Sequence, residues 1–119
     1  MIQETAMTFN VLIKEEEGIF IAHCLELDLV TTATSLDQVQ TDILDVIGVQ
    51  VDYAFTNNNL EYLYHPAPQE VWKEFFECQE QWEKKHKITP PSKGETASNI
   101  FVPTWIIAKT CKRTSHYHV

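Results

Sequence analysis

An apolar stripe with helical spacing, which begins after Ser35, constrains the fold of this chain more than any other feature. The Ser35 hydroxyl can cap the free N–H groups of a helix, and Gln38 completes a capping-box pattern three residues later. The stripe consists of Leu36, Val39, Ile43, Ile47 and Val51. The asparagine run at 57–59 competes for backbone hydrogen bonds and favours a helix end near Phe55. We therefore predict an amphipathic helix over 35–55 that turns one face toward a core.

Three strand-like segments precede this helix. Residues 7–14 alternate between two faces, which is typical of a half-buried strand. The turn at 15–18 is acidic and ends in Gly18, which can adopt the positive φ that a hairpin needs. Residues 19–24 suit a second strand, and residues 29–34, rich in β-branched side chains, suit a third. The chain is thus predicted to open with a three-stranded meander and an acidic hairpin tip.

The second half of the chain contains weaker patterns. Residues 60–64 suit a short fourth strand, and aromatic residues at helical spacing predict a second helix over 69–85, with lysines at its C-terminal end. The apolar segment 100–108 predicts a last strand, which Pro103 would confine to a sheet edge or a bulge. The predicted fold class is α+β: a β-β-β-α-β antiparallel sheet with a packed helix, followed by the aromatic helix and a C-terminal strand.

The chain is 119 residues long, which fits one hydrophobic core rather than several. No apolar run approaches the ~18–20 residues that cross a bilayer. The first ten residues lack the basic and apolar regions of a secretory signal. We therefore expect a cytoplasmic protein that does not enter a membrane.

Charge is divided unevenly along the chain. Residues 1–83 carry 16 acidic and two basic side chains, a net charge of −14, whereas residues 84–119 carry seven basic and one acidic, a net charge of +6. Because nucleic-acid binding relies on lysine and arginine, the acidic body is not expected to bind a phosphate backbone. We divide the chain into a domain over 1–88 and a linker with a basic C-terminal strand and tail over 89–119.

The residues of the first half resemble those of a known family. They comprise the acidic-glycine turn at 16–18, the segment FIAHCLELDL and the helix opening TATSLDQV. Over about 7–64 the chain resembles the HicB-like antitoxin family, in which a Cys-Pro-Glu-Leu-type turn ends the second strand. The residues that match this turn are Cys24, Glu26 and Leu27, while Leu25, Asp28 and Leu29 stand where proline, proline and glycine are usual.

The resemblance implies a β-β-β-α-β partial RNase H-like fold without the metal-binding carboxylates, which binds and blocks a small RNA-cleaving toxin. Many family members add a DNA-binding module, for which this chain has no room after the aromatic helix. A toxin that holds RNA must be basic, so an acidic inhibitor would be steered onto it. The residues predicted to bind such a partner are Glu15, Glu16, Glu17, Glu26 and Asp28.

A solitary oligomeric regulatory or RNA-binding module is the alternative function. The basic tail either contacts nucleic acid, with aromatic residues available for stacking, or packs against the acidic body. The tail residues assigned to nucleic acid are Lys109, Lys112 and Arg113. Aromatic anchors are enriched at interfaces, and one small sheet offers little room for all of them. We therefore predict a homo-oligomer, with an interface formed by Trp72, Phe76 and Trp105.

No catalytic residue, cofactor or metal is predicted, and we do not expect an enzyme. The chain contains no nucleophile elbow, P-loop, dinucleotide-binding glycine pattern or zinc-hydrolase motif. The acidic pairs Asp42/Asp45 and Glu26/Asp28 have no third partner with which to hold two metal ions. A solvated acidic face is the better interpretation of these charges.

The three cysteines are odd in number, far apart and without a CxxC pair, which predicts reduced and mostly buried thiols. They are Cys24, Cys78 and Cys111. Adjacent strand residues point to opposite faces, so His23 is not expected to activate Cys24. Cys111 with His116 and His118 has a spacing that can hold zinc or nickel, but a mobile chain end is the more common explanation for so short a motif.

Overall fold

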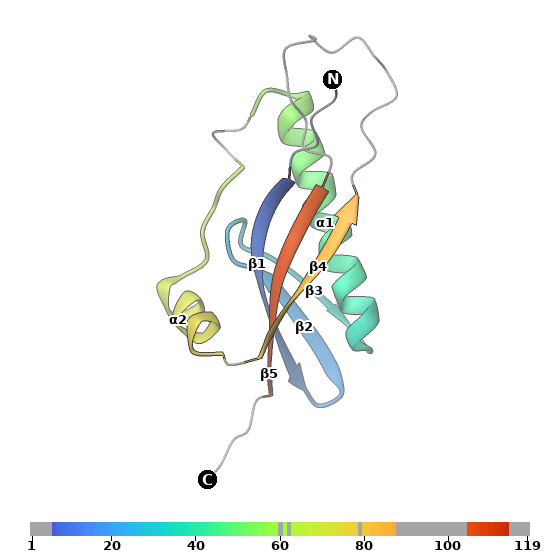
Figure 1. Cartoon of the computed structure of the whole chain (residues 1–119), viewed down its shortest axis with the longest axis vertical. Coiled ribbons are helices and arrows are strands. Elements are labelled where there is room, and N and C mark those ends of the chain that lie inside the picture. The colour runs from blue at the N-terminus through green and yellow to red at the C-terminus, as the bar shows by residue number, and fades with distance from the viewer. Residues whose placement is uncertain (1–5, 60, 62, 79, 88–104, 115–119) are drawn as a thin grey trace.

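The fold is a five-stranded mixed sheet with two helices, in the chain order β-β-β-α-α-β-β (Figure 1). The computed structural model describes residues 6–59, 61, 63–78, 80–87 and 105–114. Within these residues no helix is both long and apolar enough to cross a membrane. The elements are β1 (Ala6–Glu16), β2 (Ile19–Cys24), β3 (Leu29–Ala33), α1 (Leu36–Thr56), α2 (Gln69–Glu77), β4 (Gln81–Lys87) and β5 (Trp105–Thr114).

The predicted meander is confirmed. Strand β1 pairs antiparallel with β2, and β2 pairs antiparallel with β3. Glu16 lies opposite Ile19, so the β1–β2 turn consists of two residues, Glu17 and Gly18. Both have positive φ, 52° and 80°, which is the backbone geometry that a two-residue hairpin turn favours.

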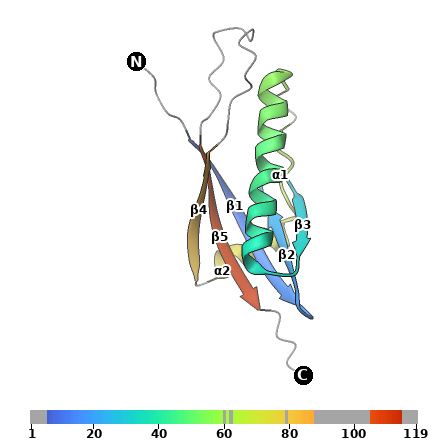
Figure 2. The ribbon, with the colours of Figure 1, turned by 90° about the vertical axis from the view of Figure 1, so that its right-hand side faces the viewer.

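The predicted first helix is also confirmed. The Ser35 hydroxyl accepts a hydrogen bond from the Gln38 backbone N–H at 3.1 Å, and the helix ends at Thr56. Asn57 caps the C-terminal end, where its side-chain amide donates to the Tyr53 carbonyl at 2.9 Å. The face that turns toward the sheet is fully buried at Val39, Ile43, Ile47 and Val51. Figure 2 shows α1 running along the strands on one side of the sheet.

The last strand differs from its prediction. Strand β5 lies in the sheet interior, between β1 and β4, so the expected edge or bulged position is wrong. It runs parallel to β1 and antiparallel to β4, and the sheet is therefore mixed rather than antiparallel. Ile106 and Cys111, which point to opposite faces, are both 0% exposed, and such two-sided burial requires an interior position. Pro103 lies outside the described residues. Strand β5 thus joins the two predicted parts of the chain in one sheet.

The predicted second helix is correct only in its first half. Helix α2 ends at Glu77, Cys78 is extended, and the chain then continues as β4. A helix over 69–85 would place Cys78 and Trp82 on one face. In the structure they lie on opposite faces of the sheet, since Cys78 is bonded to Cys111 on the α2 face and Trp82 contacts α1. The structure uses the strand: Trp82 half-buries its ring and donates from Nε1 to the Gln40 side chain of α1 at 2.7 Å. The lysines at 84–87 therefore belong to a strand and do not end a helix.

The predicted strand over 60–64 is wrong at its described residues. Glu61 has 3₁₀ geometry, Leu63 lies in a turn and Tyr64 is irregular, while residues 60 and 62 lie outside the described residues. The segment that follows is held by the β2–β3 turn instead of by a strand partner. His65 donates its backbone N–H to the Glu26 carbonyl, and Ala67 donates to the Leu25 carbonyl at 2.7 Å. These hydrogen bonds carry the chain across the sheet to the face where α2 packs.

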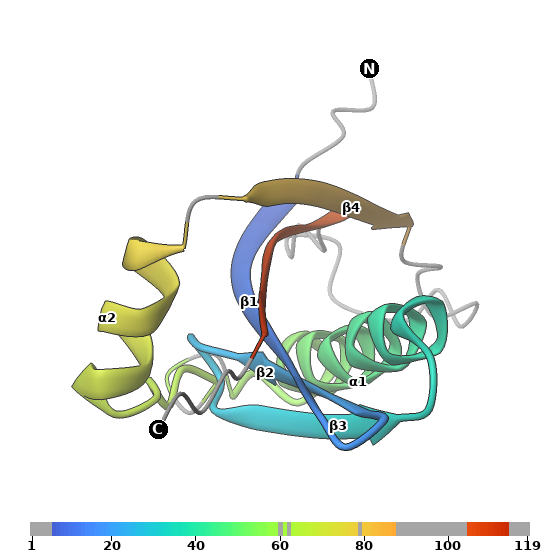
Figure 3. The same ribbon diagram turned by 90° about the horizontal axis from the view of Figure 1, so that it is seen from below.

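The two helices cover opposite faces of a strongly curved sheet, which wraps around α1 (Figure 3). The main core lies beneath α1, and a smaller cluster lies beneath α2. The smaller cluster consists of Leu12, Leu25, Ala67, Phe75 and Cys111. Because Leu12 is 1% exposed, β1 is buried on both faces in its middle, and the predicted half-buried strand is wrong at this point.

A disulfide joins Cys78 to Cys111, so the prediction of three reduced thiols holds only for the buried, free Cys24. Cys78 follows the last residue of α2, and Cys111 lies in β5 on the face that α2 covers. Their Cα atoms are 6.3 Å apart, within the range that a disulfide spans. The bond therefore connects α2 and the start of β4 to the middle of the sheet.

Candidate functional site

Three of the five acidic residues predicted to bind a partner, Glu15, Glu26 and Asp28, are already engaged within the chain. The Glu26 carboxylate accepts hydrogen bonds from the backbone N–H and the side-chain amide of Asn10, at 2.8 and 2.6 Å. Asp28 has a φ of 54° in the β2–β3 turn, and its carboxylate lies 2.6 Å from Nε2 of His23. The turn directs the two carboxylates to different partners, so they do not form the paired site that an extended segment would create.

Glu15 and the two remaining predicted residues, Glu16 and Glu17, lie at the β1–β2 hairpin. The Glu15 carboxylate pairs with Lys112 of β5 at 3.4 Å, whereas Glu16 and Glu17 are exposed at the tip. Figure 2 places this hairpin at the same end of the molecule as the N-terminus of α1, whose first turn carries the exposed Asp37. We call Glu16, Glu17 and Asp37 the acidic end. It lies about 20 Å along β1 from Asn10 and its Glu26 contact.

Six basic residues lie on two neighbouring strands of the sheet, β4 and β5. We call this set the basic ribbon: Lys84, Lys85, Lys87, Lys109, Lys112 and Arg113. Strand register places Lys85 and Lys87 on the same face as Lys109 and Trp105, the face that carries α2. The Lys87 ammonium lies 5.9 Å from the centre of the Trp105 ring. Three lysines and a tryptophan thus share one sheet face.

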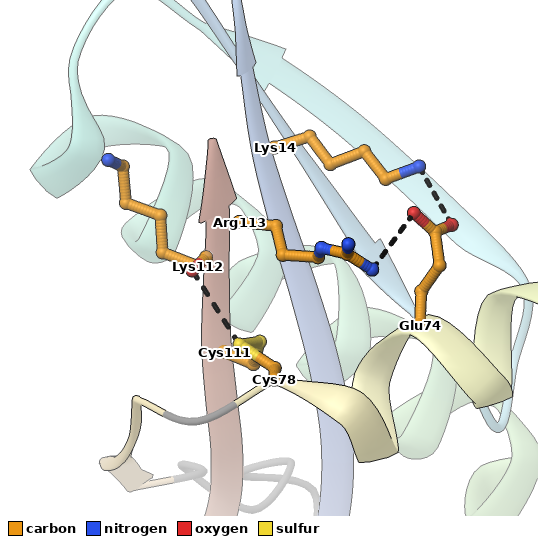
Figure 4. Close-up of polar contacts among 6 residues, drawn as sticks. All are labelled: Lys14, Glu74, Cys78, Cys111, Lys112 and Arg113. Carbon is orange, nitrogen blue, oxygen red and sulfur yellow. Dashed lines mark hydrogen bonds and ion pairs between the residues drawn. A yellow bond between two sulfur atoms is a disulfide. The ribbon is translucent and has the colours of Figure 1, made fainter. Parts of the chain in front are cut away.

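The basic tail packs against the acidic body at Arg113 and Lys112, which is one of the two predicted alternatives. The Arg113 guanidinium lies 3.7 Å from the Glu74 carboxylate of α2, which also holds Lys14 at 2.9 Å (Figure 4). Lys112 projects from the opposite side of β5 and pairs with Glu15. Lys109 is exposed and forms no ion pair within the described part of the chain. The end of β5 therefore packs against the acidic body, while the Lys109 side chain in its middle is exposed.

Sequence reasoning assigned the lysines at 84–87 to a helix end and so missed their place beside Lys109. A signal was present in the sequence. Residues 83–87 contain no aliphatic or aromatic side chain, whereas a helix packed on a sheet needs one about every third or fourth position. Such a run fits an edge strand, where charged side chains discourage pairing with other chains.

The aromatic residues predicted to form one interface occupy two separate places. Trp72 and Phe76 of α2 stack with their ring centres 6.0 Å apart, and Phe76 is 68% exposed. They border a cavity of about 550 Å³ that is lined by Gln69, Glu70, Trp72, Lys73 and Phe76. Trp105 lies on β5, six residues from the Cys111 that is bonded to the end of α2, a distance of about 20 Å. The three residues therefore do not form a continuous surface.

No group of three metal-binding side chains occurs within the described residues. The Cys111 sulfur is bonded to Cys78 and is therefore not a thiolate ligand. His116 and His118, the other members of the candidate zinc motif, lie outside the described residues. The acidic pair Asp42 and Asp45 is not joined by a further ligand, since Asp42 accepts from Gln38 and Asp45 lies 3.9 Å from His86.

Cys24 and His23 lie on opposite faces of β2, as predicted. Cys24 is 0% exposed in the main core, whereas His23 faces the other side and contacts Asp28. Burial raises the pKa of the Cys24 thiol from 9.0 to about 12. A thiol with so high a pKa is a poor nucleophile at neutral pH, because the thiolate is the reactive form. Its role is to fill space in the core.

This pKa predicts a loss of stability at high pH. Above pH 9 the unfolded Cys24 loses its proton while the folded Cys24 keeps it until about pH 12, so rising pH favours the unfolded chain across this window. We expect Cys24 to contribute a fall of roughly 1 kcal/mol in the free energy of unfolding by pH 10. Urea titrations of the wild type and of Cys24→Ala measure it as the difference between their pH slopes above pH 9. Parallel slopes would contradict the prediction.

Comparison of the chain with known protein families, with characterised proteins and with solved structures finds no match. The candidate surfaces are therefore described by their own chemistry. They are an acidic end at the hairpin tip, a basic ribbon with Trp105 at its side, and an aromatic cavity on α2.

Proposed function

We propose that this chain is a HicB-like binding module that neutralises a small, basic, RNA-cleaving toxin in the cytoplasm, without catalytic activity of its own. The observation that carries the proposal is the exposed acidic end. Glu16, Glu17 and Asp37 are exposed there and form no ion pair within the described residues, while the neighbouring Glu15 is paired with Lys112 of β5. An RNA-cleaving toxin presents a basic surface to its substrate, which such an acidic end complements.

The local fold supports the proposal as well. The β-β-β-α order over 6–56 matches the first four elements of the β-β-β-α-β order that the resemblance to HicB-like antitoxins implies, with the acidic-glycine turn and the capped helix in place. In the described residues, α2 follows α1 in place of the fifth element, a strand. Glu26, which matches the family's turn, ties that turn to β1 through Asn10. We infer that Glu26 shapes the binding module, while the exposed carboxylates of the acidic end meet the partner.

Charge reversal at the hairpin tip tests this function. We expect the full chain to co-purify with the product of a small, basic, neighbouring reading frame when the two are co-expressed. Glu16→Lys combined with Glu17→Lys should weaken that complex about tenfold or more, because each reversal replaces an attraction by a repulsion. Isothermal titration at 50 and 300 mM salt measures the affinities.

A matched reversal on α2 serves as the control. Glu70→Lys combined with Glu77→Lys changes the net charge equally at two exposed positions away from the acidic end. We expect this variant to bind within about threefold of the wild type, since only a general charge effect remains. Equal weakening by both pairs, or no complex at 50 mM salt, would count against the proposal.

The basic ribbon favours a second candidate function, the binding of single-stranded RNA. Lys85, Lys87 and Lys109 are exposed on the face of Trp105, with Glu83 as the one acidic residue among the described β4 positions of that face. Cations beside an aromatic ring are the arrangement that holds a nucleic-acid backbone and stacks a base. This face is separate from the acidic end, so the two functions can be tested independently.

Fluorescence anisotropy with a labelled uridine oligonucleotide tests the second function. We expect Lys85→Ala combined with Lys109→Ala to weaken binding and to reduce the slope of log affinity against log salt by about 0.7 for each lysine removed. Lys73→Ala, an exposed lysine on α2, should leave the slope unchanged. Absence of binding by the wild type at 50 mM salt would exclude this function.

A further inference from the structure

The two edge strands of the sheet, β3 and β4, differ in the features that prevent another strand from pairing with them. Strand β4 carries four exposed charged residues, Glu83, Lys84, Lys85 and Lys87. Strand β3, at the opposite edge, reads Leu-Val-Thr-Thr-Ala and contains no charge, proline or glycine. Proteins usually block exposed edges with charges, proline or bulges, because an open edge is a template for another strand. The β3 edge is unprotected in this respect.

The outer backbone of β3 has no strand partner within the described residues. Strand β2 pairs with one side of β3, and the register runs from Leu29 opposite Cys24 to Ala33 opposite Phe20. The N–H and C=O groups that point away from β2 therefore face outward. Val30, which is 54% exposed, and Thr32 lie on the sheet face away from α1.

Thr31, at the centre of β3, carries a second sign of an incomplete environment. Its hydroxyl oxygen is buried and has no hydrogen-bond partner in the described part of the chain. Leaving a buried hydroxyl without a partner costs about 1–3 kcal/mol, so such groups are rare in a finished structure. Rotation about χ1 can move the methyl group of threonine into the hydroxyl's position and the hydroxyl into the position of the β-hydrogen. A strand added at the open edge would then supply the missing partner.

We propose that β3 pairs antiparallel with β3 of a second copy of this chain, around a two-fold axis at Thr31, so that the two sheets form one continuous sheet. In this register Thr31 lies opposite Thr31 of the second copy, and their hydroxyls can hydrogen-bond across the axis, as facing threonines do. Val30 lies opposite Thr32 of the second copy on the face away from α1. The methyl group of Thr31 then occupies the buried position beneath α1.

A second copy suits this edge better than another strand for two reasons. Identical strands of opposite direction bring like charges together wherever a charged residue lies near the axis, and β3 has none. The pairing is also isologous, so it closes after two copies and leaves only the charged β4 edges outside. The inference does not depend on the toxin or on RNA, because neither the acidic end nor the basic ribbon includes a residue of β3.

Sedimentation equilibrium of the full chain from 1 to 200 μM tests the proposal. We expect the wild type to dimerise, and we expect Val30→Lys combined with Thr32→Lys to raise the dimer Kd about tenfold or more, because two lysine pairs would face each other across the axis. Both side chains are exposed in the single chain, so the variant should fold normally by circular dichroism. Glu83→Lys on β4, the matched control edge, should leave the Kd unchanged.

The variant Thr31→Val distinguishes a Thr31 hydroxyl that hydrogen-bonds across the two-fold axis from one that is only buried within the single chain. If Thr31 pairs across the axis, the substitution should raise the dimer Kd about three- to tenfold while it stabilises the single chain. A wild type that stays monomeric up to 200 μM would overturn the proposal. A dimer whose Kd is unchanged by the two lysines would also overturn it, because its interface would then lie elsewhere, for instance at Trp72 and Phe76. Pairing of the β3 edge with a different protein but not with a second copy would overturn it as well.

Discussion

Replacing Phe9 with alanine is expected to lower the free energy of unfolding by about 3–5 kcal/mol. Phe9 is 0% exposed in β1 and lies beneath α1, in the cluster that also contains Ile43 and Ile47. The change removes a whole aromatic ring from a core where both α1 and the sheet are held in place by other contacts, so the cavity cannot collapse fully. A domain of this size has about 5–15 kcal/mol of stability, and the loss is therefore a large part of it.

Urea unfolding followed by tryptophan fluorescence measures this effect, with two other phenylalanines for comparison. Phe75 is 2% exposed in the smaller cluster. Its replacement by alanine should lower the free energy of unfolding somewhat less than Phe9→Ala does, because fewer buried residues surround it. Phe76, 68% exposed, should lose about 1 kcal/mol or less, mainly from its stack on Trp72. A Phe9→Ala loss no larger than that of Phe76→Ala would contradict the described core.

Breaking the disulfide is the second change for which we expect a large effect. The bond between Cys78 and Cys111 closes a segment of 33 residues, and loss of such a cross-link costs about 3–4 kcal/mol through the greater freedom of the unfolded chain. Helix α2 has nine residues, of which only Phe75 is buried, so it depends on this bond more than α1 does. Reduction should therefore lower the melting temperature and speed hydrogen exchange in α2 before it affects α1.

Calorimetry with and without a strong reductant measures the change. Cys78→Ala combined with Cys111→Ala should have the lower stability and no response to the reductant, whereas Cys24→Ala should keep the full response, because Cys24 is a free thiol. Equal melting temperatures for the oxidised wild type and the double variant would disprove the stabilising role. The result matters for the proposed cytoplasmic function, since the reducing cytosol keeps most thiols unpaired.

These two sets of stabilising contacts, the main core and the smaller cluster with the disulfide, position different candidate surfaces. The main core fixes α1 and the meander, and with them the acidic end at the β1–β2 hairpin. The smaller cluster and the disulfide attach α2 and β4 to β5, and so place the lysines of β4 beside Lys109. Damage to the disulfide should thus disturb the basic ribbon more than the acidic end.

The sequence alone determined the part of the fold that local patterns encode. The positions of β1, β2 and the β-branched β3, the positive-φ turn at Gly18 and the Ser35 cap each depend on a few neighbouring residues, and all were predicted correctly. The burial of Cys24 on the face opposite His23 followed from strand alternation. Such features are readable because their physical cause lies within the segment itself.

Only the tertiary structure decided the rest, because there the partner of each segment lies far away in the chain. The aromatic spacing over 69–85 suits a helix, but pairing with β5 makes residues 81–87 a strand and turns Trp82 toward α1. Strand β5 becomes an interior strand through its register with β1, about a hundred residues earlier, which no local pattern reveals. The same placement pairs Lys112 with Glu15 and Cys111 with Cys78, and leaves β3 as the open edge.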